Sequence, residues 1–520
     1  DLSMRGVGVG FDTRGAGSFV IPGPDRTGPA ERVVVPDDRQ GGVDSVRRLL
    51  SSHFHHEAEV DFDYSQIRAA GLPLKTFGGV SSGPGPLIKL HQSLRRLLDA
   101  QRGAALSVTC ITDIMNMIGA CVVAGNIRRS AEIAFGAANC KEFLDLKDYS
   151  LNPQRMEYGW ASNNSIFADV GMDYGEACTR IQANGEPGFA WLSNMQEYSR
   201  MGEPADGRDH RVRGGNPCLE QSLESMELCC LVETFPHKHA AREDFDRTLQ
   251  IALLFAKAVT LLPLHWPEAN QVMLRNRRIG CSVSGIAQFI TARGLHELRG
   301  WLEGGYRVLR AHDGRLSEWL CVRPSIKLTS VKPSGTISLL AGATPGVHYP
   351  EARFYIRRLR MSASSPLLER LRGAGYLVEP CAVNPSETAV VEFPIDAGPG
   401  IRTTRDVSMW EQLSLAAFLQ RYWADNQVSA TVTFDPAREG PHLEHALQYF
   451  QYQLKGVSFL PRLPASAYPQ MPYEAITEEE YAEAMSRLHH RVSLSSSHSA
   501  VETDAQAQQS FCDTDTCSLP

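Results

Sequence analysis

The 520-residue sequence has no long uninterrupted run of apolar residues. Its most apolar stretch, residues 251–266, contains Lys257 and Pro263 and is too short to span a membrane. The first residues carry neither the basic region nor the apolar region of a secretory signal. The sequence therefore predicts a protein that does not enter a membrane.

Cysteine is also scarce, with 12 residues in the whole chain, which is too few for a secreted protein held together by disulfides. Cys110, Cys121, Cys178 and Cys281 each stand alone in apolar or helical surroundings, where a small buried thiol is the usual interpretation. A reducing, cytoplasmic location fits this usage best. The net charge of −7 is small for the length and argues against direct nucleic-acid binding, which usually needs a basic surface.

The bulk composition is that of a globular protein, with 43% apolar and 21% charged residues. Apolar spacing predicts helices at residues 43–53 and 243–262, and Pro263 ends the second of these. Short β-branched runs predict strands at residues 32–35, 327–331 and 429–434. Helices that alternate with short strands over several hundred residues predict an α/β protein with mainly parallel strands.

The composition changes near the end of the chain. Residues 478–490 have the pattern of a last helix, and residues 491–510 are polar with almost no large apolar groups, which is typical of a flexible linker. Cys512 and Cys517 follow this linker, where no core exists for them to fill. Zinc binding is a poor explanation, because two ligands on a flexible tail do not make a four-ligand site.

The segment NPCLEQSLESMELCC, residues 216–230, holds the densest cluster of chemically useful side chains. Pro217 disfavours helical geometry at the residue before it, and alternate residues of an extended chain face the same way. We therefore expect Asn216, Cys218 and Glu220 to present an amide, a thiol and a carboxylate to one small volume. An amide can hold hydroxyls, a carboxylate can take a proton, and a thiol can do nucleophilic, redox or radical chemistry. The pattern alone also fits a loop with one buried cysteine and two solvated polar groups.

A second segment, residues 332–336 (KPSGT), precedes an apolar run and predicts a turn of small residues. The backbone N–H groups of such a turn can bind phosphate, although turns of this kind are common.

Residues 215–236 resemble the active-site finger loop of ribonucleotide reductases, in the form found in adenosylcobalamin-dependent (class II) ribonucleoside-triphosphate reductases of the monomeric type. The resemblance extends along the whole chain, through matching segments in the same order. These segments are residues 6–17, 61–87, 111–136, 159–166, 184–194, 275–285, 331–350 and 422–434.

The resemblance implies the ten-stranded α/β barrel of the ribonucleotide reductase and glycyl radical enzyme type, in which two parallel halves meet antiparallel around a central finger loop. It divides the chain into three parts. Residues 1–105 are the glycine-rich start of the barrel with an insertion for the effector site, residues 106–490 are the catalytic barrel, and residues 491–520 are a flexible tail with a redox cysteine pair.

The resemblance also implies a role for each residue of the motif. Cys218 is the thiol that becomes a thiyl radical and abstracts the ribose 3′-hydrogen, Glu220 is the general base toward the 3′-hydroxyl, and Asn216 holds the ribose hydroxyls. Cys229 is one half of the dithiol that reduces the 2′-position, and its neighbour Cys230 is a packing residue.

The implied ligands and partners follow from the same resemblance. Ser334, Gly335 and Thr336 hold the substrate's phosphates, and the tail pair Cys512 and Cys517 passes electrons from thioredoxin to the active site by thiol exchange. Adenosylcobalamin is the cofactor and carries the cobalt, so no protein metal site is expected. The substrate is a ribonucleoside triphosphate, a deoxynucleoside triphosphate is the effector, and the protein is a monomer.

Several departures from the family pattern leave alternatives open. The partner of Cys229 is expected upstream of Gly6, but no cysteine precedes Cys110, and the chain does not begin with Met. We therefore expect an N-terminally truncated fragment that does not sustain turnover. The sequence has no DxHxxG motif, no tyrosine after Tyr481 and no glycine in residues 488–520, and the last two absences disfavour the tyrosyl- and glycyl-radical classes. A nucleotide-binding protein without reductase turnover, or a reductase of another radical class, is the alternative.

Overall fold

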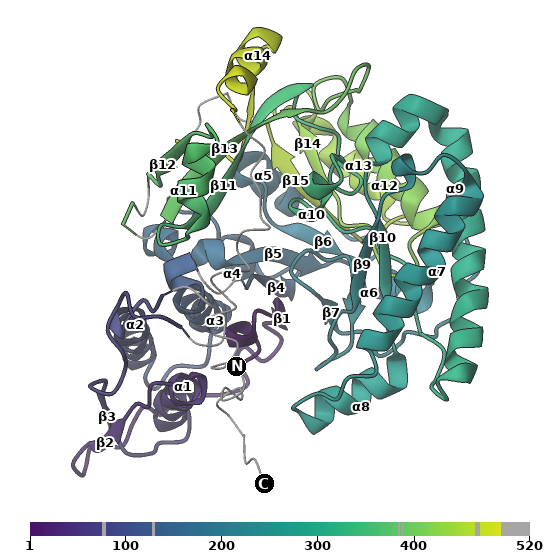
Figure 1. The fold of residues 1–520 in the computed structure, drawn as a ribbon. Helices are drawn as coiled ribbons and strands as arrows, with labels where there is room; N and C mark the ends of the chain where they lie inside the picture. The colour runs from purple at the N-terminus through teal and green to yellow at the C-terminus, as the bar shows by residue number, and fades with distance from the viewer. Residues whose placement is uncertain (75–79, 127–129, 383–384, 387, 463–468, 490–520) are drawn as a thin grey trace.

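The computed structural model describes residues 1–74, 80–126, 130–382, 385–386, 388–462 and 469–489. Helices and strands alternate along these ranges, as predicted for an α/β protein (Figure 1). In the described ranges, no helix is both long enough and apolar enough to cross a membrane.

A six-stranded sheet forms the centre of the molecule. Its strands, in spatial order, are β1 (Val9–Asp12), β4 (Glu132–Ala137), β5 (Ser162–Phe167), β6 (Gly188–Ala190), β15 (Gly456–Pro461) and β14 (Thr431–Phe434). The first four are parallel to one another, and β14 is parallel to β15. The two groups meet antiparallel where β15 pairs with β6. This is the junction that the resemblance implies.

The second parallel group continues beyond this sheet. Strands β9 (Leu231–Thr234) and β10 (Gly280–Val283) are parallel, and single parallel bridges connect Cys281 to Thr329 and Val331 to Val428. The arrangement agrees with two parallel halves, while closure into a barrel of ten strands stays a prediction.

The strand predicted at residues 327–331 is present only as these isolated bridges. The N–H groups of Leu328 and Thr329 donate to the Asp425 carboxylate, at 3.0 Å and 2.7 Å, instead of to a neighbouring strand. The strand predicted at residues 429–434 is confirmed as β14, two residues shorter at its start.

Helices surround the sheets, with α7, α8 and α9 along one side of the molecule (Figure 1). The helices of this part of the chain are α4 (Lys141–Leu144), α5 (Gly175–Asn184), α6 (Leu192–Glu197), α7 (Arg242–Val259), α8 (Pro267–Asn276), α9 (Ile286–Trp319, interrupted at Gly294), α10 (Ile337–Leu340), α12 (Met409–Tyr422) and α13 (Leu443–Phe450). The predicted apolar stripe of α7 is buried in the main core, where Trp191 and Trp423 are the largest fully buried side chains.

The N-terminal part has a small core of its own and lies to one side of the central sheet (Figure 1). Its elements are β2 (Glu31–Val34), α1 (Arg39–Phe54), β3 (Val60–Asp63), α2 (Gly85–Ala100) and α3 (Val108–Val122). Strands β2 and β3 are parallel with α1 as the crossover, and Leu49, Leu90 and Leu94 pack between the helices. The helix predicted at residues 43–53 is confirmed as α1.

An antiparallel sheet with two helices covers another edge of the molecule. It contains β12 (Val378–Pro380), β13 (Thr388–Asp396), β11 (Phe354–Ser362) and β16 (Tyr473–Ala475), with helices α11 (Leu367–Gly373) and α14 (Glu478–Ser486). The predicted helix at residues 478–490 is therefore confirmed but ends four residues earlier. A capping box between Thr477 and Glu480 begins it.

The isolated cysteines lie where the sequence predicts. Cys110, Cys178 and Cys281 are buried, and Cys121 is half-buried. Among the described residues, the buried Cys110, Cys178 and Cys281 are free thiols.

Candidate active site

The first part of the motif, residues 216–223, forms a hairpin with the two residues before it, and this hairpin lies against β1 of the central sheet. Strands β7 (Gly214–Gly215) and β8 (Ser222–Leu223) pair antiparallel, and we call residues 214–223 the finger hairpin. Gly10 of β1 lies so close that a Cβ atom there would overlap the carbonyl oxygen of Gly215. A Cβ atom on Gly8 would lie 2.7 Å from Cγ of Pro217. The glycine-rich start of the chain therefore makes room for the hairpin.

The prediction that residues 216–220 are extended is wrong. The N–H of Leu219 donates to the carbonyl of Asn216 at 2.8 Å and closes a turn. Leu219 has φ of 56°, in the left-handed region that costs energy for a branched side chain. Its buried side chain packs against Phe135 and Met195, and this burial offsets the strain. Tertiary packing thus outweighs the preference of Leu219 for a negative φ.

Cys218 is the accessible thiol of the hairpin. Its side chain lines a cavity of about 110 Å³ that also touches β4, β5, β14 and β15. The hydroxyl of Ser429 donates to the Cys218 carbonyl and fixes the backbone beside the thiol. Although the cavity reaches the thiol, burial by the surrounding protein and the charge of Glu220 raise the pKa of Cys218 to about 11. The group is therefore a thiol, not a thiolate, near neutral pH.

Glu220 is fully buried, unlike Cys218 two residues earlier. Its Oε1 accepts a hydrogen bond from Nζ of Lys332 at 3.0 Å, and the Oε2 atom has no partner among the described residues. Asn216 is also buried, and its Oδ1 accepts from the N–H of Gln221 at 3.0 Å. The recorded partner of the carboxylate is thus a lysine rather than the amide of the motif.

Lys332 was not selected from the sequence as a site residue. Burial lowers its pKa, but the charge of the Glu220 carboxylate outweighs that effect, so the pKa of Lys332 is raised and the side chain is charged. The sequence feature that could have pointed to Lys332 is its position directly before the turn of small residues, where a positive charge could face a bound anion.

Cys229 and Cys230 follow the finger hairpin and lead into β9. Cys229 is half-buried, and burial together with the charge of Glu220 raises its pKa to about 12. Cys230 is buried, as expected of a packing residue, and its carbonyl accepts from the N–H of Gly280 at 2.9 Å. Cys218, Glu220, Cys229 and Lys332 are thus close enough to influence one another electrostatically.

The turn expected to bind phosphate is next to this group. Ser334 has φ of 50° and is buried, and its hydroxyl donates to the carboxylate of Glu233 in β9. Burial raises the pKa of Glu233 to about 7, although Ser334 and neighbouring serine hydroxyls oppose the shift. Thr336 is exposed, at the start of the four-residue helix α10. The sequence analysis also did not select Glu233 as a site residue. The feature that could have indicated it is a carboxylate directly after the apolar residues Leu231 and Val232 of a strand.

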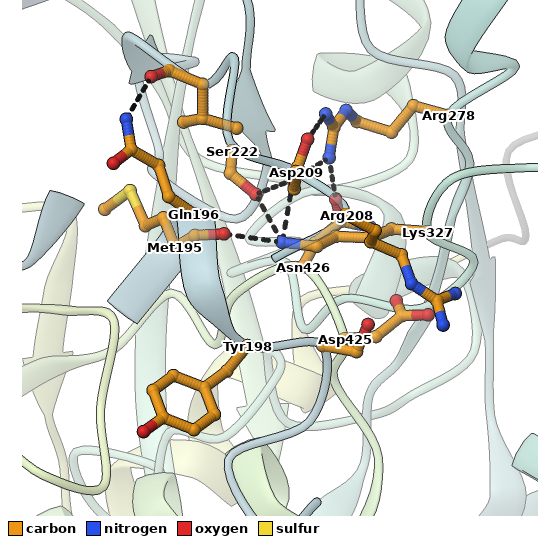
Figure 2. Close-up of polar contacts among 12 residues, drawn as sticks. Met195, Gln196, Tyr198, Arg208, Asp209, Ser222, Arg278, Lys327, Asp425 and Asn426 are labelled. Carbon is orange, nitrogen blue, oxygen red and sulfur yellow. Dashed lines mark hydrogen bonds and ion pairs between the residues drawn. The ribbon is translucent and has the colours of Figure 1, made fainter. Parts of the chain in front are cut away.

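A buried network of charges contacts the finger hairpin at Ser222 (Figure 2). Oδ1 of Asp209 is 2.6 Å from Nη2 of Arg278, and its Oδ2 is 2.7 Å from Nζ of Lys327. Nζ of Lys327 lies 3.4 Å from the hydroxyl of Ser222 in β8, and Nε of Arg278 lies 2.9 Å from the carboxylate of Glu227. The network therefore holds the end of the hairpin and the loop that follows it.

The remaining predicted pair, Cys512 and Cys517, falls outside the described residues.

Comparisons with known proteins identify the family of the chain. Residues 27–98 match the family model "B12-dependent ribonucleotide reductase, insertion domain". An adenosylcobalamin-dependent ribonucleoside-triphosphate reductase of Euglena gracilis is 70% identical over 517 residues, covering 99% of this chain and 71% of that protein. The chain belongs to the adenosylcobalamin-dependent ribonucleoside-triphosphate reductases.

Further members of this reductase family support the assignment. A probable adenosylcobalamin-dependent ribonucleoside-triphosphate reductase of Dictyostelium discoideum is 53% identical, with 100% of this chain and 70% of that protein covered. The crystal structure of a B12-dependent (class II) ribonucleotide reductase has a TM-score of 0.82 and 30% identity, and the match covers 98% of this chain and 78% of that one. The fold predicted from the resemblance is confirmed at this level.

Proposed function

We propose that this chain carries the catalytic site of an enzyme that reduces ribonucleoside triphosphates to 2′-deoxyribonucleoside triphosphates with adenosylcobalamin as cofactor. The observation that supports it best is the grouping of three side chains in the finger hairpin and in the segment that follows it. An accessible thiol, a buried carboxylate with one unpartnered oxygen, and a second thiol lie together at Cys218, Glu220 and Cys229. These are the groups that radical reduction of a ribose needs.

The surroundings of Cys218 fit the cofactor. The thiol is reached from a cavity bordered by Asn163, Ser429 and Ser458, whose polar groups would hold the reactive end of a much larger molecule. When bound, adenosylcobalamin would supply an organic radical, and the Cys218 thiol would be the hydrogen-atom donor to it. The raised pKa of Cys218 keeps that hydrogen on the sulfur at neutral pH.

The other residues act on the ribose. Cys218, once it has lost its hydrogen atom, takes the 3′-hydrogen. A serine cannot replace Cys218, because its O–H bond is too strong for the hydrogen atom to be lost in the first place. Glu220 takes the proton of the 3′-hydroxyl through its unpartnered oxygen, and Asn216 holds the ribose hydroxyls. Cys229 and a second thiol together supply two electrons and two protons, so that the 2′-hydroxyl leaves as water and the thiols become a disulfide. Cys218 then returns the hydrogen atom to C3′, and Glu220 returns the proton to the 3′-oxygen.

The tail and the turn complete the proposal. Cys512 and Cys517 would reduce this disulfide by thiol exchange, with thioredoxin as the external reductant. The backbone at Gly335 and the exposed Thr336 would contact the substrate's phosphates, together with Ser334 when its hydroxyl turns away from Glu233.

We also propose that the insertion at residues 27–98 takes a deoxynucleoside triphosphate effector in a monomeric protein. The free cysteines favour a reducing, cytoplasmic location.

The test is cobalamin-dependent chemistry at Cys218. The full-length protein should reduce a ribonucleoside triphosphate with adenosylcobalamin and a small dithiol, and should catalyse hydrogen exchange between solvent and the cofactor. A Cys218→Ser protein should bind nucleotide as the unchanged protein does, yet show neither reaction. Reduction by Cys218→Ser above background would remove the proposed role, and nucleotide binding without reduction by the unchanged protein would favour a binding protein without turnover.

A further inference from the structure

The surroundings of Glu220 explain how a fully buried carboxylate can act as a base. Lys332 is the cation recorded within 4 Å of it among the described residues, with Nζ 3.0 Å from Oε1. The other titratable groups that face it are Cys218 and Cys229, and both have raised pKa values. The backbone N–H of Gln427 donates to the Glu220 carbonyl at 3.1 Å rather than to the carboxylate. Lys332 therefore supplies the charge that opposes the desolvation of Glu220.

The backbone of Lys332 is held in place on both sides. Its N–H donates to the hydroxyl of Ser282 at 2.8 Å, and its carbonyl oxygen packs so closely against Gly346 that a Cβ atom there would overlap it. Gly346 has φ of 54°, which a glycine adopts without strain. The side chain of Lys332 thus starts from a fixed point and reaches across to the finger hairpin.

The chemistry requires Glu220 to be ionised before the substrate reacts. Burial strongly disfavours an isolated carboxylate, which takes up a proton unless a cation or hydrogen bonds stabilise its charge. A protonated Glu220 would be unable to accept the proton of the 3′-hydroxyl. Because Lys332 occupies only Oε1, the Oε2 atom is left for the substrate.

We propose that Lys332 is a positioning residue for this reaction: it keeps Glu220 ionised inside the protein and fixes the carboxylate so that Oε2 faces the ribose 3′-hydroxyl. The inference rests on the proposed function of Glu220 as the base. Lys332 also directly precedes the turn at residues 333–336, so the base and the proposed phosphate contacts share one segment of backbone.

The first experiment compares Lys332→Met with Lys332→Arg in the full-length protein, by single-turnover reduction across a range of pH. Loss of an opposite charge at this distance moves a carboxyl titration by about 1–3 pH units. The acidic limb of the rate profile should therefore move upward by about that amount in Lys332→Met. The rate should recover at alkaline pH, and Lys332→Arg should restore the original profile. Lys141→Met, which removes an exposed lysine of α4, is the matched control and should leave the profile unchanged.

The second experiment reads the carboxyl group directly and needs no turnover. Infrared difference spectra of this chain, with Glu220→Gln as the reference, report the pH at which Glu220 takes up its proton. In Lys332→Met that pH should lie about 1–3 units higher than in the unchanged chain. No displacement would overturn the proposal, as would a rate loss in Lys332→Met that is equal at every pH.

The two experiments separate this inference from the proposed function. If Glu220→Gln reduces substrate normally, Glu220 is not the base and the proposed function of that residue fails. The infrared displacement would still establish that Lys332 controls the charge of Glu220.

Discussion

The hydroxyl of Ser334 donates a hydrogen bond to the carboxylate of Glu233, so a residue proposed to hold phosphate is engaged by an anion. The hydroxyl of Ser282 donates to the other carboxylate oxygen at 3.1 Å. A substrate triphosphate at this turn must therefore displace or neutralise Glu233. Because burial raises the pKa of Glu233 to about 7, its charge changes in the physiological range.

Replacing Glu233 should make nucleotide binding less dependent on pH. As pH rises through about 7, Glu233 loses its proton and its negative charge repels the phosphates. We expect affinity for a ribonucleoside triphosphate to fall by about tenfold, or ~1.4 kcal/mol, between pH 6 and pH 8 because of this group. In Glu233→Gln this tenfold fall in affinity between pH 6 and pH 8 should be absent. Calorimetric titration without cofactor measures it, and Glu297→Gln on the exposed face of α9 is the control. Parallel pH dependence in the two variants would contradict the role of Glu233.

Replacing Glu220 should slow chemistry without weakening binding. Glu220→Gln keeps the shape of the side chain but cannot accept the 3′-hydroxyl proton, so nucleotide affinity should hold within a few-fold. The chemical step should slow by about 10²–10⁴, the usual contribution of a general base. Binding and single-turnover reduction are measured on the same preparation. Equal losses in both would make Glu220 a binding residue.

The tail cysteines should matter for one reductant and not for another. In the full-length protein, replacing both Cys512 and Cys517 with serine should abolish repeated turnover driven by thioredoxin, because the electrons then have no carrier to the active site. A small dithiol that enters the site should still support turnover at nearly the original rate. Thioredoxin-driven turnover by the double variant would show that the shuttle is elsewhere.

Gly10 should be intolerant of a side chain. A Cβ atom there overlaps the Gly215 carbonyl oxygen, so Gly10→Ala should push the finger hairpin away from β1. We expect a cost of about 1–3 kcal/mol in stability, as for other overpacked sites, and a clear loss of cofactor hydrogen exchange. Gly15→Ala is the matched control, because no atom lies within 4 Å of the added group. Thermal unfolding and hydrogen exchange on both variants decide between a local clash and a general sensitivity to substitution.

The sequence predicted those features that depend on local pattern. The apolar period of α7 predicted a helix that is present, the motif of residues 216–230 predicted the candidate site, and the order of matching segments identified the family. Sequence did not predict the turn at Leu219, because that conformation is stabilised by contacts with Phe135 and Met195, far away in the chain.

Lys332 and Glu233 were missed for a related reason. Lys332 acts across 112 positions of sequence on Glu220, and Glu233 acts across 101 positions on Ser334. Each residue has an ordinary side chain in an ordinary local pattern. Only the folded chain brings each one to its partner, so no spacing rule in the sequence reports the contact.

Asp209 should be the most sensitive acidic residue beneath the hairpin. Its buried carboxylate faces Arg278 and Lys327 at 2.6 Å and 2.7 Å, and Glu227 balances the second positive charge. Asp209→Asn leaves a buried cation uncompensated, so we expect a loss of about 3–5 kcal/mol in the free energy of unfolding. The measurement is chemical denaturation at neutral pH.

The pH dependence separates this ion pair from a packing defect. Burial alone would raise the pKa of Asp209, but Arg278 and Lys327 outweigh it and hold the pKa well below its usual range. The stabilisation is therefore complete above the unfolded-state pKa of about 3.9 and is lost as pH falls toward the lowered native pKa. The stability difference between the unchanged protein and Asp209→Asn should shrink below about pH 4. Asp44→Asn, which removes the exposed partner of Arg47 in α1, should cost about 0–1 kcal/mol. A loss in Asp209→Asn that is constant with pH would assign the effect to packing instead of charge.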